Sequence, residues 1–274
     1  MKTSFFAGKG ENKLKRIFFL MALLWTILIV ALAGWTYQQS FSNTLDGSIT
    51  SARDTFFRDL VYRRWAAGHG GVYVPITPET PPNPYLINVP ERDITTPSGK
   101  KLTLVNPAYM TRQVHELGRE QYGLRGHITS LRPIRPENAP DEWEKRALMA
   151  FERGEKEVSS LDQIGQETYF RLMRPLITDP GCLKCHAGQG YKAGDIRGGI
   201  SISSPWGNFR QGLRAQLRTI TVAYGAIWVI GLLGLWLSWN QTHGYLSERK
   251  QAEDDLKASL RDKEVLLREL YHRT

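Results

Sequence analysis

Both cysteines of the chain lie in one five-residue motif, Cys182-Leu183-Lys184-Cys185-His186. Two thiols separated by two residues can each add across a vinyl group of one haem, and the imidazole of the next residue can then bind the iron. The sequence therefore predicts one covalent haem c, held by thioether bonds to Cys182 and Cys185, with His186 as an iron ligand.

Zinc binding and dithiol redox chemistry are the alternatives for this spacing, and both fit less well. A zinc site needs two further ligands at suitable spacing, and the sequence has no second cysteine pair. A redox motif of the thioredoxin type follows a strand and opens a helix. Here turn-forming residues flank the motif at 178–181 and 187–190, which indicates a loop.

A six-coordinate haem needs a second axial ligand opposite His186, and four side chains are candidates: Met110, His69, His115 and His127. We expect Met110, because it lies near the start of a predicted helix and a thioether is a known haem ligand. The alternative interpretation of Met110 is that it is an ordinary core residue. His69 is the alternative ligand, although the glycines around it are also explained as a helix stop. A position left open for a gas such as nitric oxide is a further alternative. Four arginines are candidates for pairing with the haem propionates, namely Arg132, Arg135, Arg171 and Arg174.

Two uncharged apolar runs, residues 17–35 and 219–239, divide the chain and predict transmembrane helices at 17–36 and 219–239. A helix needs about 20 apolar residues to cross a bilayer. Basic residues at 9, 13, 15 and 16 predict a cytoplasmic N-terminus, which places the central domain in the periplasm and the chain in the bacterial inner membrane. Arg210, Arg214 and Arg218 argue for the opposite orientation, but long translocated loops weaken the charge rule.

The layout that follows is a basic leader at 1–16, the first span, a periplasmic haem domain at 37–218, the second span and a cytoplasmic helix at 240–274. Ala31-Leu32-Ala33 resembles a signal-peptidase site, so a cleaved signal peptide is the alternative for the first span. We favour an uncleaved anchor, because the apolar run continues to Trp35. The net charge of +9 comes with no aromatic-basic groove motif, so we expect a membrane surface as partner and no nucleic acid.

The elements between the spans predict an α+β fold. Apolar residues at 45, 49, 52, 56 and 60 continue the first helix to a stop at 68–71, and an irregular, proline-rich stretch with short strands follows to residue 107. We expect helices at 108–122 and 142–153 and strands at 126–131, 168–177 and 198–203, with the haem motif between the last two strands. A small antiparallel sheet flanked by helices is the arrangement of PAS-like extracellular sensor domains.

Leucines at 246, 256, 260, 267 and 270 fall on the a and d positions of one heptad register. Charged residues occupy other positions of the same seam, so the sequence predicts a weak coiled coil and, through it, a homodimer. A solvated single helix is the alternative.

The central domain resembles the c-type haem sensor domains found at the front of bacterial transmembrane signalling proteins. Five segments carry the resemblance: residues 69–74, 106–113, 129–131 and 136–144, and the haem motif. It implies a haem sensor of redox state or of a diatomic gas. Some members use a cysteine upstream of the segment that matches 129–131 as the distal ligand, and Met110 lies in the comparable stretch of this chain.

The tail at 263–273 resembles the phosphoacceptor helix of sensor histidine kinases of the second dimerisation class, and the resemblance makes His272 the phosphoacceptor. It implies a downstream kinase module and a response regulator as partners. No ATP-binding domain is recognisable in this sequence, so enzyme activity of the chain itself stays open. A membrane-anchored periplasmic electron-transfer cytochrome is the alternative function, but it leaves the second span and the charged helix without a purpose.

Overall fold

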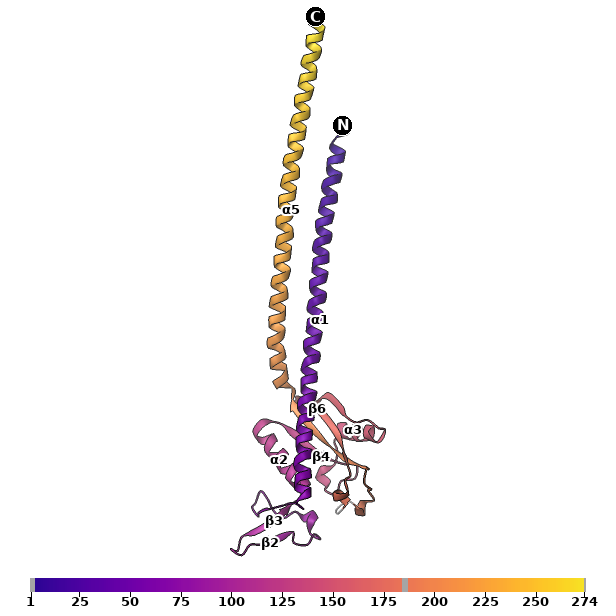
Figure 1. Cartoon of the computed structure of the whole chain (residues 1–274), viewed down its shortest axis with the longest axis vertical. Helices are drawn as coiled ribbons and strands as arrows, with labels where there is room; N and C mark the ends of the chain where they lie inside the picture. The colour runs from indigo at the N-terminus through magenta and orange to yellow at the C-terminus, as the bar shows by residue number, and fades with distance from the viewer. Residues whose placement is uncertain (1–2, 184–186, 274) are drawn as a thin grey trace. The chain divides into compact units, whose positions relative to one another are not determined.

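The structure is a computed structural model that describes residues 3–183 and 187–273 (Figure 1). Cys185 and His186 therefore lie outside the described residues. The chain divides into two compact units, one formed by Phe41–Arg214 and the other by Met1–Ser40 together with Ala215–Thr274. Helices and small antiparallel sheets make up the first unit, which confirms the predicted α+β class.

The elements follow one another in this order: α1 (Thr3–Gly68), β1 (Val72–Pro75), η1 (Pro84–Leu86), β2 (Asp93–Thr95), β3 (Lys101–Val105), α2 (Pro107–Tyr122), β4 (Arg125–Thr129), η2 (Pro136–Asn138), α3 (Glu142–Glu152), β5 (Val158–Ile164), β6 (Glu167–Ile177), η3 (Pro180–Cys182), η4 (Ala187–Gln189), β7 (Ile196–Pro205) and α5 (Trp206–Arg273). The C-terminal end of α1, both ends of α2 and the strands β4, β6 and β7 lie within one or two residues of their predicted positions. Strand β5 is not among the predictions.

The main sheet of Phe41–Arg214 has four antiparallel strands in the order β4-β7-β6-β5. Its two central strands, β6 and β7, are buried along most of their length. Side chains of a strand alternate between the two faces of its sheet, so a central strand that is buried throughout must be covered on both faces.

The first face of the sheet packs against α1. Ala52 and Phe56 of α1 contact Phe170 and Leu172 of β6 and Ile202 of β7 in one buried cluster. The periodic apolar residues that predicted this part of the helix are therefore the residues that bury it. Fully burying one such side chain contributes about 1.5–3 kcal/mol.

The second face packs against α3 (Figure 1). Trp143, Leu148 and Phe151 of α3 form a buried cluster with Met173 of β6. Asp141 caps the first turn of α3, because its side chain accepts a hydrogen bond from the backbone N–H of Glu144 while the Glu144 side chain accepts one from the backbone N–H of Asp141. This reciprocal capping box fixes where α3 begins.

Helix α2 lies against the edge strand β4. Asn106 caps it by accepting a hydrogen bond from the backbone N–H of Tyr109, and Pro107 follows as its first residue. Gly123 ends it with a left-handed φ of 69°, which glycine adopts at little cost.

A second, three-stranded antiparallel sheet in the order β1-β3-β2 occupies the proline-rich stretch before α2. The sequence predicts short strands in this stretch, but it does not predict that they pair into a sheet of their own. The prediction of one small sheet is thus incomplete, because the Phe41–Arg214 unit contains two.

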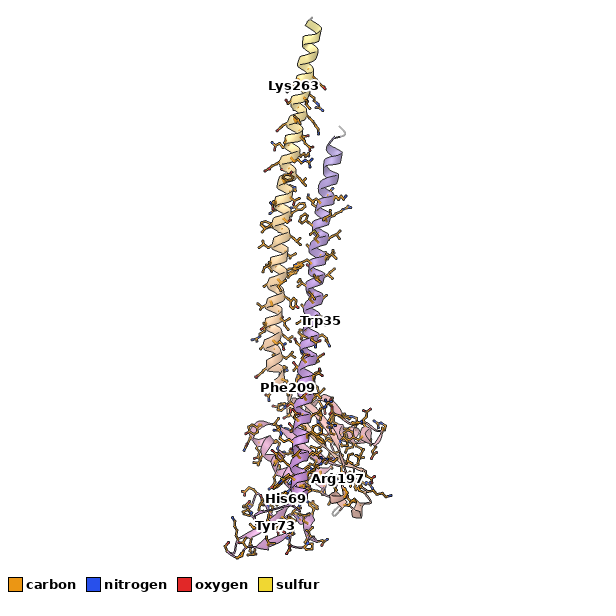
Figure 2. All side chains as sticks on the ribbon, in the orientation of Figure 1. Trp35, His69, Tyr73, Arg197, Phe209 and Lys263 are labelled. Carbon is orange, nitrogen blue, oxygen red and sulfur yellow. The ribbon has the colours of Figure 1, made fainter. Side chains whose placement is uncertain are left out.

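In the other unit, the apolar parts of α1 and α5 lie side by side. The indole N–H of Trp25 donates to the carbonyl of Trp228 at 3.2 Å, and the indole N–H of Trp228 donates to Thr26 Oγ1 at 3.0 Å. The hydroxyls of Thr36 and Tyr224 lie 2.9 Å apart. Both helices are long and apolar enough to cross a membrane, and apolar side chains project from them (Figure 2).

Candidate functional site

A cavity of about 700 Å³ lies in the Phe41–Arg214 unit, next to the loop that carries the Cys-x-x-Cys-His motif. Its walls come from one side of α2, from β4 and from residues 130–138, which we call the cavity loop. Leu176 at the end of β6 and Gly198 near the start of β7 also line it. Since the motif connects these two strands, the cavity lies at the base of the motif loop.

The described cavity lining is strongly basic. Seven arginines and two glutamates line the cavity: Arg63, Arg112, Arg119, Arg125, Arg132, Arg135 and Arg197, with Glu116 and Glu137. The two glutamates are close to arginines of the same wall, at 3.8 Å for Glu116–Arg112 and 3.2 Å for Glu137–Arg135. A concave surface with this excess of positive charge favours an anionic ligand.

Arg63 of α1 is the most buried cation of the cavity, with 8% of its surface exposed. Its guanidinium donates to Thr111 Oγ1 at 3.2 Å and to the carbonyl oxygen of Pro107 at 3.3 Å. Burial, followed by repulsion from Arg197, lowers the pKa of Arg63 to about 10. Cys182 and Asp59 act in the opposite direction on this pKa.

His115 of α2 lines the cavity and forms a buried pair with Asp59 of α1. Its Nε2 lies 2.7 Å from Asp59 Oδ2, and each side chain is 10% exposed. Its Nδ1 is buried and has no hydrogen-bond partner within the described ranges. The ring packs on Gly126 of β4 so closely that a Cβ at that position would lie 2.5 Å from three ring atoms.

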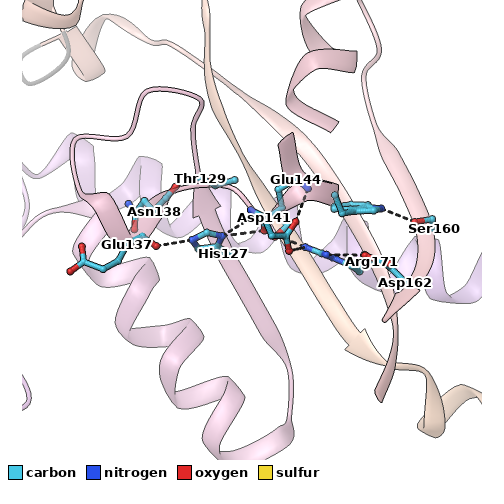
Figure 3. A network of polar contacts seen from close by, with 11 residues as sticks. His127, Thr129, Glu137, Asn138, Asp141, Glu144, Ser160, Asp162 and Arg171 are labelled. Carbon is cyan, nitrogen blue, oxygen red and sulfur yellow. Dashed lines mark hydrogen bonds and ion pairs between the residues drawn. The ribbon is translucent and has the colours of Figure 1, made fainter. Parts of the chain in front are cut away.

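His127 of β4 lines the same cavity, but both of its ring nitrogens are engaged. Nδ1 lies 2.9 Å from Glu144 Oε2, and Nε2 lies 3.3 Å from the carbonyl oxygen of Glu137 (Figure 3). Burial alone would lower the pKa of His127. The hydrogen bond to Glu144 and its charge, with the Glu137 carbonyl and Asp141, outweigh burial, so the pKa lies above its usual value.

Glu144 connects His127 to a buried polar network behind the cavity (Figure 3). Its carboxylate also accepts a hydrogen bond from the hydroxyl of Ser201 and lies 3.5 Å from Arg171. Arg171 bonds Asp141 at 2.7 Å and Asp162 at 3.1 Å. The network accounts for two of the charged residues of segment 136–144, Asp141 and Glu144, which cap α3 and pair with Arg171.

The structure does not bring Met110 and His69 to the described cavity lining. With about 3.6 residues per turn, the lining residues Ala108, Arg112, His115 and Arg119 share one side of α2, and Met110 lies on the opposite side. His69 follows the end of α1 (Figure 2). Its Nδ1 lies 2.8 Å from the Trp65 carbonyl, and its ring packs on the Trp65 ring.

Two of the four arginines predicted to pair with the haem propionates, Arg132 and Arg135, line the cavity. The other two do not: Arg171 belongs to the buried network, and Arg174 stacks on Phe57. Cys182 is half-buried, Cys185 and His186 lie outside the described residues, and His272 lies in the last turn of α5, where side chains are not described.

The site residues that the sequence analysis did not predict include Asp59, Arg63, Gly126 and Arg197. For two of them a signal existed. Asp59 and Arg63 follow Phe56 by three and seven residues, so they lie on the packed face of an otherwise apolar helical pattern. A buried charge on such a face needs a hydrogen-bonding partner. Asp59 bonds His115 and Arg63 bonds Thr111, both on α2.

An α+β domain with a basic cavity beside a Cys-x-x-Cys-His loop defines a class of ligand-binding domain. The chain belongs to the Tll0287-like family, which it matches over residues 43–205, more than half of its length. Among solved structures it is similar to the cyanobacterial heme-protein Tll0287, at 16% identity and a TM-score of 0.35, over 58% of this chain and 93% of that one. Among curated proteins, none matches.

Proposed function

We propose that residues 43–205 form a haem-binding sensor domain that carries one haem c on Cys182 and Cys185, with His186 as an iron ligand. Membership of the Tll0287-like family supports haem binding, since the protein Tll0287 is described as a heme-protein. The observation that carries the proposal is that Leu176 and Gly198, close to the two ends of the loop that carries the motif, line the basic cavity together with Gln189 of that loop.

The described residues fit a haem in three respects. The cavity of about 700 Å³ lies within the usual range of cofactor sites. Its arginines can pair with two propionate carboxylates, and Arg132 and Arg135 of the cavity loop are the predicted partners that lie there. The buried Nδ1 of His115 has no partner among the described residues, which would cost about 1–3 kcal/mol if it stayed unsatisfied, and this is a reason to expect a group that bonds it.

The haem, when bound, supplies an iron that changes oxidation state and can bind small ligands. The protein holds the ends of the motif loop in place: the backbone N–H of Thr178 donates to the carbonyl of Asp195, and the N–H of Gly194 donates to the carbonyl of Thr178. The positive cavity wall favours the less positive, reduced state of a bound iron. This bias is the expected electrostatic contribution of the chain to a redox sensor.

At the level of the whole chain, the proposal is the input half of a membrane-bound sensor histidine kinase with a PAS-like periplasmic domain. Two helices that are long and apolar enough to span a membrane support the membrane part. Signalling needs a two-state element that couples the haem to the output, and α1 and α5, which continue beyond the domain, are the natural elements. His272 as phosphoacceptor, a homodimer through the C-terminal helix and a response regulator as partner complete the proposal.

Covalent haem attachment is the decisive test. The full chain, produced with a cytochrome c maturation system, should gain the mass of one haem and keep its pigment through denaturing electrophoresis. Cys182→Ala with Cys185→Ala should abolish both signals, whereas Met149→Ala, an exposed residue of α3, should change neither. Extraction of all the pigment by acid acetone would show that the haem is not covalently bound and would contradict the proposal.

A further inference from the structure

Both ring nitrogens of His127 face hydrogen-bond acceptors. Nδ1 lies 2.9 and 3.1 Å from the two carboxylate oxygens of Glu144, and Nε2 lies 3.3 Å from the carbonyl oxygen of Glu137 (Figure 3). A carboxylate and a carbonyl can only accept, and a neutral imidazole donates from one nitrogen only. The two contacts can be satisfied together only when both nitrogens carry a proton, so this geometry is that of an imidazolium.

We propose that His127 is a proton-dependent clamp on the cavity wall: as an imidazolium it fastens the cavity loop, residues 130–138, to β4, and the loss of its proton loosens that loop. The role is one of positioning, because His127 acts on the cavity through the loop. It concerns the cavity assigned to haem, but it holds in the absence of haem as well.

The buried carboxylate that faces His127 is Glu144, whose side chain is 3% exposed. Arg171 of the same network is 4% exposed, whereas Asp141 and Asp162 are 50% and 33% exposed and are in part solvated. Buried charges are stable only when they are paired and hydrogen-bonded. Glu144 lies 2.9 Å from His127 Nδ1 and 3.5 Å from Arg171, so the imidazolium of His127 is its closer cationic partner.

Loss of the proton affects the two bonds of His127 unequally. A neutral ring donates its remaining N–H most favourably to the buried Glu144 carboxylate, since hydrogen bonds to charged acceptors are the stronger ones. The unprotonated Nε2 then faces the Glu137 carbonyl, and two acceptors repel each other. The loop keeps its neighbouring bond on the same strand, from Thr129 Oγ1 to the carbonyl of Asn138 at 2.8 Å.

The charged groups around the ring set the pH range of this change. Glu144 and Asp141 of α3 stabilise the charged ring, Arg171 of β6 lies behind them, and Arg135 is paired with the Glu137 side chain on the loop. Burial works against the charged ring, but these acceptors outweigh it, so the pKa of His127 lies above 6.5. The clamp is therefore closed below pH 6.5 and opens as the pH rises through this raised pKa.

The loop that the clamp holds supplies part of the cavity wall. Arg132, Ile134, Arg135 and Glu137 of the cavity loop line the cavity. Loosening of the loop therefore changes both the charge and the closure of the wall, which makes entry into this cavity dependent on pH.

Hydrogen–deuterium exchange of the full chain in detergent, measured at several pH values and corrected for intrinsic exchange, tests the clamp. Two amides at the end of the loop report on it, those of Asn138 and of the next residue, Ala139, which donate to the carbonyls of Arg135 and Pro136. We expect their protection to fall several-fold as the pH rises from below 6.5 through the pKa of His127. His127→Gln should remove this step and leave the amides weakly protected throughout, and His69→Gln should keep the step.

The same step in His127→Gln as in the unmodified protein would overturn the proposal. If His127→Gln does not fold, Glu144→Gln provides a second test, because removal of the buried charge lowers the pKa of His127 and should move the step to lower pH. An unmoved step would also overturn the proposal. Since exchange is measured without reference to haem, a failure to attach haem would refute the proposed function and not the clamp.

Discussion

The Asp59–His115 pair illustrates how tightly single residues are fitted at the cavity. The imidazole lies between a carboxylate of α1 and the bare Cα of Gly126 in β4. The backbone of Gly126 is that of an ordinary strand residue, so conformation does not require glycine here. Glycine is required because a larger side chain would not fit beside the His115 ring.

Gly126→Ala should therefore displace the His115 ring and break its bond to Asp59. Overpacking of a closed site typically costs about 1–3 kcal/mol, and we expect a loss of this size in the free energy of unfolding, measured by chemical denaturation of the full chain in detergent. Gly118→Ala is the matched control, because its nearest contact would be at 3.9 Å. Equal effects of the two substitutions would contradict the role of Gly126.

The raised pKa of His127 makes stability depend on pH in a defined direction. A histidine whose pKa is higher in the folded state stabilises fully below its unfolded pKa, near 6.5, and this contribution is lost as the pH rises through the folded value. The free energy of unfolding should therefore fall above pH 6.5 in the unmodified chain. The slope should be smaller in His127→Gln, and an unchanged slope would assign the dependence to other groups.

Met110 is the distal ligand predicted from the sequence, but it lies on the side of α2 opposite the described cavity lining, so its ligation of the iron needs a direct test. A thioether ligand gives ferric haem a weak near-infrared charge-transfer band and a higher potential than two imidazoles. Met110→Ala should remove the band, and His69→Ala should leave it in place. If the unmodified protein lacks the band, the assignment passes to another residue, and His115 is then the cavity histidine with a nitrogen that is unpartnered in the described part of the chain.

At the scale of elements, the capping box of α3 serves both the helix and the buried network. Asp141 accepts from the backbone N–H of Glu144 and also bonds Arg171. Asp141→Ala should cost about 0.5–2 kcal/mol through the lost cap, and more through the lost ion pair with Arg171, which keeps its bond to Asp162. Asp141→Asn keeps a capping oxygen and should lose only the ionic part, so an equal loss of thermal stability in both variants would show that the cap contributes little.

The sequence was sufficient to predict elements with a clear period or stop signal. The apolar steps from Leu45 to Leu60 and the glycines at 70 and 71 located the end of α1, and alternation located β7. Strand β5 was missed because only one of its faces contacts the sheet core and its polar residues mask the alternation. The cavity was beyond prediction for a different reason: its walls combine α1, α2, β4 and β7, and such long-range contacts leave no local pattern.

For the whole molecule, the proposed topology has both ends in the cytoplasm and the haem domain in the periplasm. A reporter that is active only in the periplasm should work when it is inserted at Gly154, an exposed turn after α3, and should be silent when it is fused after Thr274. The reverse pattern would show that Arg210, Arg214 and Arg218 determine the orientation.

The proximity of Arg63 and Arg197 in the cavity wall has a consequence for handling the protein. Two cations that repel each other in a largely buried site destabilise the fold unless an anion lies between them. Any anion that binds the folded chain only will stabilise it by mass action. Haem-free protein should therefore melt at a higher temperature in phosphate or sulfate than in chloride of equal ionic strength, and it should lose this preference in Arg197→Gln.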